Sequence, residues 1–180
     1  MDHAIDSNTQ KYVNFGTDGD TAIPFAPAVG FEVTPLFGGS VVTSVRFFAA
    51  NDAPDRDPAQ FQLFGSNDGT NFSMITDMSV SLSNTAADVG GGATNTGRNA
   101  ANLAISDTDP NAYNNALVSF SNSDSYTSYR LLVTQVRSNM ATNSTQMGEV
   151  QLLGQVPEPS TLALLGLSTL GVGLIRRRRR

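Results

Sequence analysis

The side chains that carry covalent catalysis are nearly absent from this sequence. His3 is the only histidine, and the chain contains no cysteine. A Ser-His-Asp set requires a histidine held inside the fold, and a nucleophilic thiol requires a cysteine. The sixteen acidic residues leave a carboxylate pair for glycoside hydrolysis open as an alternative, although no spacing in the sequence points to one. We therefore predict a protein that is not an enzyme.

Oxygen-bearing side chains are concentrated in one short segment, residues 51–58, which reads Asn-Asp-Ala-Pro-Asp-Arg-Asp-Pro. Carboxylate and amide oxygens at this density are suited to a sugar or to a cation. Alternatively, Arg56 forms an ion pair with Asp55 or Asp57 and holds a bend in the chain. We favour this second, structural interpretation.

The charge of the chain is divided unevenly. Five of the eleven basic residues end the chain, whereas fifteen of the sixteen acidic residues lie within residues 1–154, which therefore carry a net charge of about −9. Nucleic acid and anionic membrane surfaces repel such a segment, so we predict no nucleic-acid partner. Its length suffices for one domain with its own core, which no disulfide reinforces.

The last part of the chain has the pattern of a membrane segment. Residues 161–175 are uncharged and mostly apolar, and five consecutive arginines follow them. As a helix, residues 160–175 span about 24 Å, short of a hydrocarbon core of about 30 Å, and the arginine stems extend this reach. A buried core helix does not explain the arginines. We predict a single transmembrane helix with the arginines in the cytoplasm and residues 1–156 on the far side.

Three parts in fixed order make the tail resemble the PEP-CTERM sorting signal of Gram-negative bacteria. The signal consists of a Pro-Glu-Pro motif, the apolar segment and the arginine cluster, here Pro157, Glu158, Pro159, Arg176, Arg177, Arg178, Arg179 and Arg180. The resemblance implies that a membrane enzyme, exosortase, cleaves near Pro-Glu-Pro. It further implies a precursor in the inner membrane with its head in the periplasm, and a product at the cell surface or outside the cell. We assign residues 155–180 to this signal and residues 1–154 to a separate domain.

Export also requires a leader at the N-terminus. Residues 1–6 have neither a basic segment nor an apolar one. We therefore expect a start upstream of Met1, with its signal peptide, or a fragment of a longer chain.

The N-terminal domain shows the short alternating segments of an all-β protein. Residues 83–110 are poor in apolar side chains, and we interpret them as a long loop with a short helix or strand near residues 102–105. Gly90–Gly92 is a flexible stretch rather than a phosphate cradle, because no Lys-Ser/Thr follows. Asp68-Gly69 predicts a type I′ hairpin turn. The pattern predicts a β-sandwich with about eight strands near residues 11–15, 30–34, 41–49, 60–65, 72–76, 116–120, 128–136 and 147–153.

Three motifs in order resemble the discoidin-like, galactose-binding jelly roll that many carbohydrate-binding modules share. Residues 4–12 are similar to the early loop A-x-D-G/N-x-x-T-K-W/Y of that family. Residues 61–72 are similar to its S-x-D-G hairpin, and residues 129–131 with 148–154 are similar to its last strands. The resemblance implies a jelly-roll β-sandwich over most of residues 1–154, with a first strand that precedes Ala4.

The resemblance also implies a structural calcium ion that ties the early loop to the last strand. Mapped onto this sequence, Asp6 and Thr9 with nearby backbone carbonyls meet Glu149. Calcium prefers six to eight such oxygen ligands. The alternative is that Asp6 and Thr9 shape an Asx turn while Glu149 makes a salt bridge.

Sugar sites in this fold use exposed aromatic, Arg and Asn side chains on loops. The candidates here are Arg98, Tyr113, Tyr126 and Arg137, each with the alternative of an ordinary surface residue, and the chain has no tryptophan for a strong stacking platform. Two functions follow. One is an exported module that binds exopolysaccharide or another carbohydrate. The other is a structural protein of the biofilm or envelope without a specific small ligand.

Overall fold

A computed structural model describes residues 4–14, 29–83, 98–101, 103–106, 108–138 and 144–156. The predicted all-β class is confirmed. In these ranges the chain forms short 3-10 turns, η2 (Pro54–Arg56) and η4 (Pro110–Ala112), and the strands β1 (Tyr12–Asn14), β2 (Val29–Val33), β3 (Val41–Phe48), β4 (Pro58–Ser66), β5 (Ser73–Ser79), β6 (Asn115–Ser119), β7 (Ser128–Val136), β8 (Thr145–Met147) and β9 (Glu149–Gln155).

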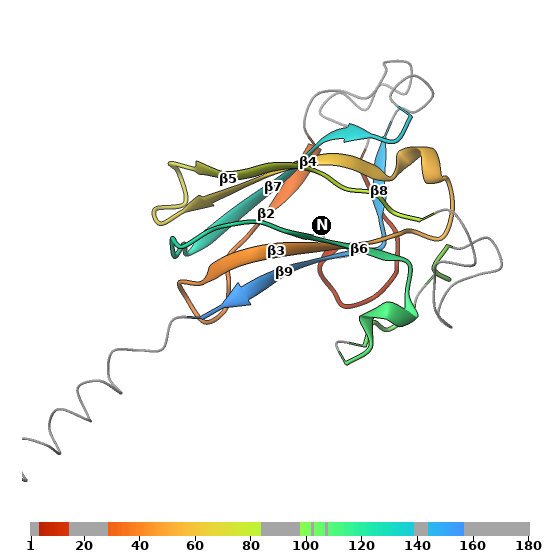
Figure 1. Ribbon diagram of the computed structural model, residues 1–180, viewed down its shortest axis with the longest axis horizontal. Coiled ribbons are helices and arrows are strands. Elements are labelled where there is room, and N and C mark those ends of the chain that lie inside the picture. The colour runs from red at the N-terminus through yellow and green to blue at the C-terminus, as the bar shows by residue number, and fades with distance from the viewer. Residues whose placement is uncertain are drawn as a thin grey trace, which may run out of the picture.

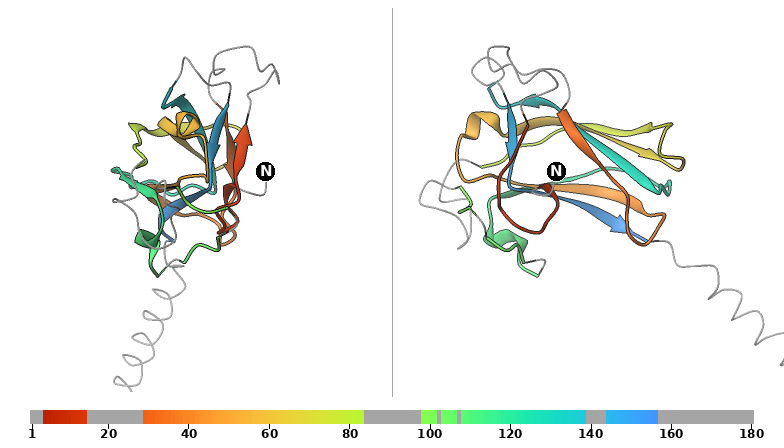
Figure 2. Two further views of the ribbon diagram at one scale, coloured as in Figure 1. Left: turned by 90° about the vertical axis from the view of Figure 1, so that its right-hand side faces the viewer. Right: turned by 180° about the vertical axis from the view of Figure 1, so that it is seen from behind.

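The strands form a sandwich of two antiparallel sheets. One sheet has the order β2-β7-β4-β5 and the other has the order β6-β3-β9. The two sheets face each other as upper and lower layers in Figure 1, and the separate β1–β8 pair stands across one end. The two further views in Figure 2 show the same two layers. Strands β2 and β9 are therefore edge strands of opposite layers.

The core between the layers follows the alternation of the strand sequences. Phe47 of β3 packs on Phe61 of β4 with ring centroids 5.0 Å apart, and both side chains are fully buried. Leu63, Leu131 and Val133 fill the space beside them and are at most 1% exposed. From Phe61 to Gly65 of β4 and from Tyr129 to Val133 of β7, every second residue is buried, as the period of two requires.

The first residues of β3 face the opposite side of the sheet from the side that the sequence predicted. The sequence pattern places Val41 on the same face as Val45 and Phe47. In the structure the register shifts between Val42 and Ser44, and Val42, 4% exposed, joins the core instead. A bulge of this kind adds one residue to a strand and moves the residues before it to the other face.

The turn at Asp68-Gly69 is longer than the predicted two-residue hairpin. Strand β4 ends at Ser66 and β5 begins at Ser73, and of the two turn residues only Gly69 has a positive φ, at 70°. The Asp68 carboxylate organises this loop, because it accepts hydrogen bonds from the backbone N–H groups of Thr70 at 2.8 Å and Asn71 at 2.7 Å. These bonds, with that of the Asn71 side chain, lower the pKa of Asp68. The type I′ turn is therefore wrong, although the hairpin itself is present.

The predicted membrane helix, residues 160–175, lies outside the described residues, as do Gly90–Gly92. In the part of the chain that the structure describes, no helix is long and apolar enough to cross a membrane. Strand β8 had no strand of its own in the sequence prediction. The isolated bridge between Asn8 and Ala104 lies where a short helix or strand was predicted near residues 102–105.

Candidate functional site

The early loop lies against the first residue of β9. The backbone N–H groups of Asp6 and Ser7 donate to Glu149 Oε2 at 2.9 and 3.2 Å. The Asp6 carboxylate in turn accepts from the N–H of Asn8 at 3.0 Å, which closes an Asx turn. Ser7 adopts a φ of 58°, and this conformation turns the loop toward the carboxylate. Asp6 and Glu149, which are 143 residues apart in sequence, are thus brought together as predicted.

Glu149 is a buried carboxylate that lacks a cationic partner in the described chain. It is 2% exposed, and no ion pair among the described residues includes it. Burial, with a smaller contribution from the nearby charge of Asp6, raises the pKa of Glu149 to about 8, although the N–H donors of the early loop act against the rise. Ionised Glu149 is therefore destabilised in the protein alone, and a cation placed beside it would reverse this.

Thr9 makes different contacts from those predicted. Its side chain is fully buried, and its hydroxyl donates to the carbonyl of Ala100 at 2.5 Å and accepts from the N–H of Leu103 at 2.8 Å. The backbone adds two bonds, from Thr9 N to Leu103 O and from Ile105 N to Ser7 O, each 2.8 Å long. Thr9 therefore fastens the early loop to residues 100–105, and its hydroxyl is already engaged by protein groups.

Asp6 and Glu149 carry carboxylate oxygens, which are hard ligands of the kind that calcium takes. Within the described ranges no three His, Cys, Asp or Glu side chains gather around one point, so backbone carbonyls and water would have to complete a calcium shell here. The feature that fits a divalent ion is the burial of Glu149 without a cationic partner among the described residues.

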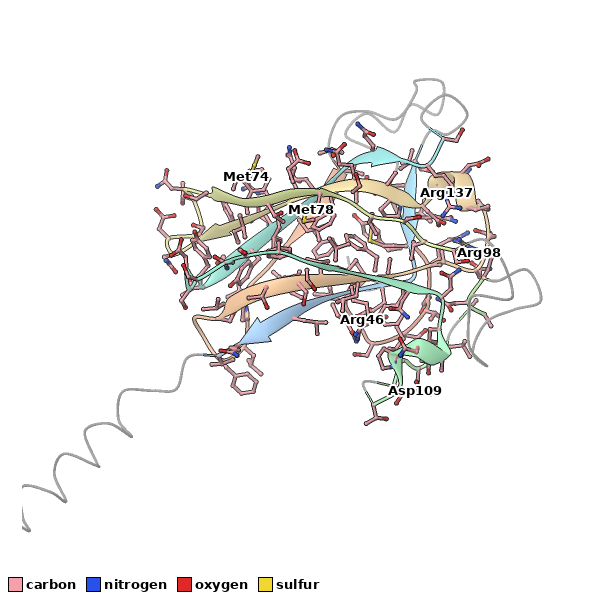
Figure 3. The ribbon with its side chains drawn as sticks, viewed as in Figure 1. Arg46, Met74, Met78, Arg98, Asp109 and Arg137 are labelled. Carbon is pink, nitrogen blue, oxygen red and sulfur yellow. The ribbon has the colours of Figure 1, made fainter. Side chains whose placement is uncertain are left out.

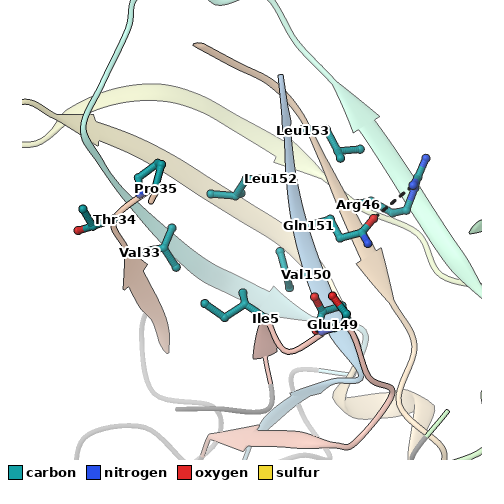
Figure 4. A pocket seen from close by; sticks show the side chains of 11 residues that line it. Ile5, Val33, Thr34, Pro35, Arg46, Glu149, Val150, Gln151, Leu152 and Leu153 are labelled. Atoms are coloured by element: carbon teal, nitrogen blue, oxygen red, sulfur yellow. Dashed lines mark hydrogen bonds between the residues drawn. The ribbon is translucent and has the colours of Figure 1, made fainter. Parts of the chain in front are cut away.

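A groove of about 460 Å³ follows the free edge of β9 beside this site. In Figure 4, Val150 and Leu152 point from β9 toward Val33 and Pro35, whereas Gln151 points to the other side, where Arg46 lies. Arg46 Nη1 donates to Gln151 Oε1 at 3.3 Å. The sequence analysis missed this groove, because it arises between the edges of two strands that are far apart in the chain.

A second buried carboxylate, Asp57, organises the polar segment 51–58. Asp57 is fully buried, and the guanidinium of Arg98 donates to both of its carboxylate oxygens at 2.6 and 2.7 Å. Arg137 donates to Asp57 Oδ2 at 3.2 Å. Figure 3 shows Arg98 and Arg137 together at one end of the sandwich. The segment is structural, as favoured from sequence, but Asp57 pairs with these two arginines and not with Arg56.

The four predicted sugar contacts do not converge on one site, although the two arginines lie together at Asp57. Arg98 is 3% exposed and belongs to the Asp57 cluster, so it is not a surface residue; Arg137 keeps 28% of its side chain exposed. Tyr113 packs edge-on against Phe48 at the end of β3, and its hydroxyl donates to the Ala104 carbonyl at 2.9 Å. Tyr126 pairs through its backbone with Ser40, just before the start of β3. The two tyrosines therefore lie at opposite ends of the sandwich.

Comparison with solved structures identifies the fold. The chain is similar to CBM32-3 from a family 31 glycoside hydrolase of Clostridium perfringens, with a TM-score of 0.53, 10% identity and coverage of 85% of this chain and 81% of that one. It is also similar to the family 32 carbohydrate-binding module of C. perfringens NanJ in complex with galactose, with a TM-score of 0.51, 10% identity and coverage of 83% and 81%. At this identity the likeness shows that the chain shares the β-sandwich fold of these modules and nothing finer. No curated protein matches the chain in sequence.

The tail has its own match. Residues 155–180 fit the family model described as the PEP-CTERM protein-sorting motif. The match includes Pro157, Glu158, Pro159 and the five terminal arginines, all of which lie outside the described residues. The chain therefore joins a galactose-binding-like β-sandwich to a C-terminal PEP-CTERM sorting motif.

Replacing Arg98 tests the Asp57 cluster. We expect Arg98→Met to destabilise the fold by about 3–5 kcal/mol, because it leaves a fully buried carboxylate without its bidentate partner. The matched control is Arg130→Met, since Arg130 pairs with Glu32 on the surface, where an ion pair contributes about 1 kcal/mol or less. Urea unfolding followed by tyrosine fluorescence measures both changes. Equal losses in the two variants would contradict a structural role for the cluster.

Glu149 makes stability depend on pH in a defined direction. Its pKa of about 8 in the folded protein exceeds its ordinary value of 4.5, so the folded state holds a proton that the unfolded state has lost. With metal ions removed by EDTA, we therefore expect Glu149 to contribute on the order of 3 kcal/mol to the free energy of unfolding. This contribution is complete below about pH 4.5 and is lost as the pH rises through 8.

The control for this pH dependence is a pair of matched substitutions. Glu149→Gln keeps the acceptor for the Asp6 and Ser7 amides but has no proton to lose, so its unfolding free energy should change less between pH 5 and 8. Glu32→Gln, at a carboxyl whose side chain is 52% exposed, should keep the wild-type slope. A wild-type slope in Glu149→Gln would show that another group is responsible.

Proposed function

We propose that the chain is an exported surface protein that exosortase processes and whose β-sandwich binds carbohydrate. The observation that carries the proposal is the combination of a PEP-CTERM motif at residues 155–180 with a fold similar to carbohydrate-binding modules. The motif supplies the route to the cell surface, and the sandwich supplies the binding domain. The modules it resembles in fold are accessory binding domains, so the protein acts by attachment and not by catalysis.

In this proposal the tail anchors a precursor in the inner membrane. The uncharged residues 161–175 cross the bilayer, and Arg176–Arg180 stay in the cytoplasm. The sandwich then lies in the periplasm until exosortase cleaves near Pro157–Pro159. The acidic sandwich, with a net charge of about −9 over residues 1–154, is released from or attached to the cell surface, where exopolysaccharide is the ligand in reach.

Calcium belongs to the same proposal as a structural ion. Asp6 and Glu149 hold it together with backbone carbonyls of the early loop, and its charge stabilises the ionised form of Glu149. What supports it is the burial of Glu149 without a cationic partner in the described chain. When bound, the ion fastens the early loop to β9, so that residues 6–9 and, through Thr9, residues 100–105 keep their places.

A calcium titration tests this ion. A ligand at 100 times its dissociation constant contributes about 2.7 kcal/mol of stability, so we expect the melting temperature of the full chain in detergent to rise by several degrees. Glu149→Gln and Asp6→Asn should weaken or abolish the rise, while Asp77→Asn, at an exposed carboxylate held by Gln60 and Gln62, should not. An unchanged melting temperature for the wild-type protein would remove calcium from the proposal.

The sugar contacts are proposed at residues whose aromatic or Arg side chains are partly buried and partly exposed. Tyr113 and Arg137 lie toward the end of the sandwich where β3 finishes. Tyr126 lies at the other end. Arg98 is left out because it is buried. Since the two tyrosines are too far apart to share one sugar ring, they define two alternative sites.

A glycan array read with the full chain distinguishes these sites. We expect binding to at least one polysaccharide, and we expect either Tyr113→Ala or Tyr126→Ala to reduce it about tenfold or more. The reason is that stacking of a ligand ring on one aromatic side chain contributes roughly 1–3 kcal/mol. Tyr113→Phe and Tyr126→Phe keep the ring and serve as controls. Binding that survives both alanine variants would move the site elsewhere on the sandwich.

The alternative function is a structural protein of the biofilm or envelope without a specific small ligand. The separate positions of Tyr113, Tyr126 and the two arginines favour it, because convergent side chains are what a sugar site requires. Absence of binding on the array, with the protein still retained in the extracellular matrix, would support this alternative.

A further inference from the structure

The turn between β2 and β3 exposes two adjacent large apolar side chains. Leu36 is 90% exposed and Phe37 is 80% exposed, the highest values among the large hydrophobic residues that the structure describes. The turn is defined in shape, because Gly38 takes a φ of 82° and its N–H donates to the Pro35 carbonyl at 3.2 Å. A folded turn that holds Leu and Phe side by side in water indicates a surface that contacts something apolar.

This turn lies where the chain leaves the sandwich toward its tail. Val41, just after the turn, pairs with Gln155 at the end of β9. Pro35 and Val156 line the same small cavity of about 200 Å³, and Val156 is itself 53% exposed. Figure 1 and the right-hand view of Figure 2 both show the end of β9 beside the turn that joins β2 to β3. Leu36, Phe37 and Val156 are thus exposed apolar residues at the same corner of the sandwich, and we call these three residues the exit patch.

The chain segments that hold the exit patch carry no charged side chains, unlike the domain as a whole. Residues 33–45 and residues 150–157 contain no charged side chain, whereas residues 1–154 as a whole carry a charge of about −9. The β6–β7 loop, whose Ser125 lies beside Gly39, contributes one charge through Asp124. An acidic domain does not adsorb broadly on an anionic bilayer, but an uncharged apolar turn at its edge can enter the interface.

The sequence of the tail brings a bilayer within reach of the exit patch. The uncharged run begins at Thr161, five residue steps after Val156. A fully extended chain covers at most about 3.6 Å per residue, so this linker spans no more than about 18 Å. A tether this short raises the local concentration of bilayer at the patch far above that of any free partner.

We propose that Leu36 and Phe37 insert into the bilayer interface beside the segment 161–175, so that the turn and the tail hold the sandwich at two points. The inference rests on the membrane location given under the proposed function. It also sets an orientation, because β9 runs from Glu149 to Gln155 and rises by about 20 Å over its seven residues. The Glu149 end therefore points away from the membrane, and of the two alternative sugar sites only the one at Tyr113 lies at that end.

Site-specific fluorescence tests the insertion, because the chain has no native cysteine. The full chain carrying Leu36→Cys is labelled with a small environment-sensitive fluorophore and reconstituted into vesicles of phosphatidylethanolamine and phosphatidylglycerol. A nitroxide-bearing lipid then quenches any fluorophore within the interface. The control is Met74→Cys, on β5, where Met74 is 54% exposed and points away from the exit patch (Figure 3).

We expect quenching at position 36 to exceed that at position 74 several-fold, and Phe37→Gln in the Leu36→Cys background to reduce it toward the level at position 74. Quenching at position 36 no stronger than at position 74 would overturn the inference. Shielding of position 36 from aqueous iodide without lipid quenching would overturn it as well, because a protein surface, such as a second copy of the chain or exosortase, then covers the patch.

A fluorophore at Ser168→Cys separates this inference from the proposed function. Lipid quenching at position 168 without quenching at position 36 would leave the membrane location intact and remove only the insertion of the turn. Absence of lipid quenching at both positions would remove both. Because Leu36 is almost fully exposed, its replacement should leave the urea midpoint unchanged, which checks that the labelled protein is folded.

Discussion

A carboxylate withdrawn from water must be paired with a cation or keep its proton, and this constraint shapes one end of the sandwich. Asp57 meets it within the chain, because Arg98 binds both of its oxygens and Arg137 binds one. Backbone bonds also join two of the segments in this cluster, from Arg137 N to Asp57 O at 2.9 Å and from Ser138 N to Asp55 O at 3.1 Å. The side chain of Arg98 adds a third segment. Segments that lie far apart in sequence are thus fixed by one buried charge.

Glu149 meets the constraint differently. Only backbone N–H groups of the early loop reach it in the described chain, and its pKa is accordingly raised. The contrast with Asp57 is informative, because both carboxylates are almost completely buried. Arginine side chains fix Asp57 within the chain, whereas only backbone N–H groups link Glu149 to the early loop in the described chain. Under the calcium proposal, an ion from outside the cell would strengthen this second link.

Much of this fold was predictable from local pattern. The alternation in residues 60–65 and 128–136 located β4 and β7, because their core faces carry Phe61, Leu63, Leu131 and Val133. Strand β8 was missed since its residues Thr145 and Gln146 are polar yet fully buried, and a buried polar strand has no apolar alternation to detect. The pairing of Asp6 with Glu149 came from a family motif, whereas the pairing of Asp57 with Arg98 depends on tertiary contact and leaves no trace in spacing.

The two ends of the sandwich have different characters, and the direction of β9 connects them. Its first residue, Glu149, lies at the end that holds the early loop, and its last residue, Gln155, lies at the end from which the tail departs. Under the proposed membrane location, attachment through the tail leaves the Glu149 end free, because the tail leaves from the opposite end. Of the two alternative sugar sites, Tyr113 lies at the free end, whereas Tyr126 lies at the end of the tail. The exposed side chains of Leu36 and Phe37 lie at the same end as Tyr126, which is where the proposed insertion requires them.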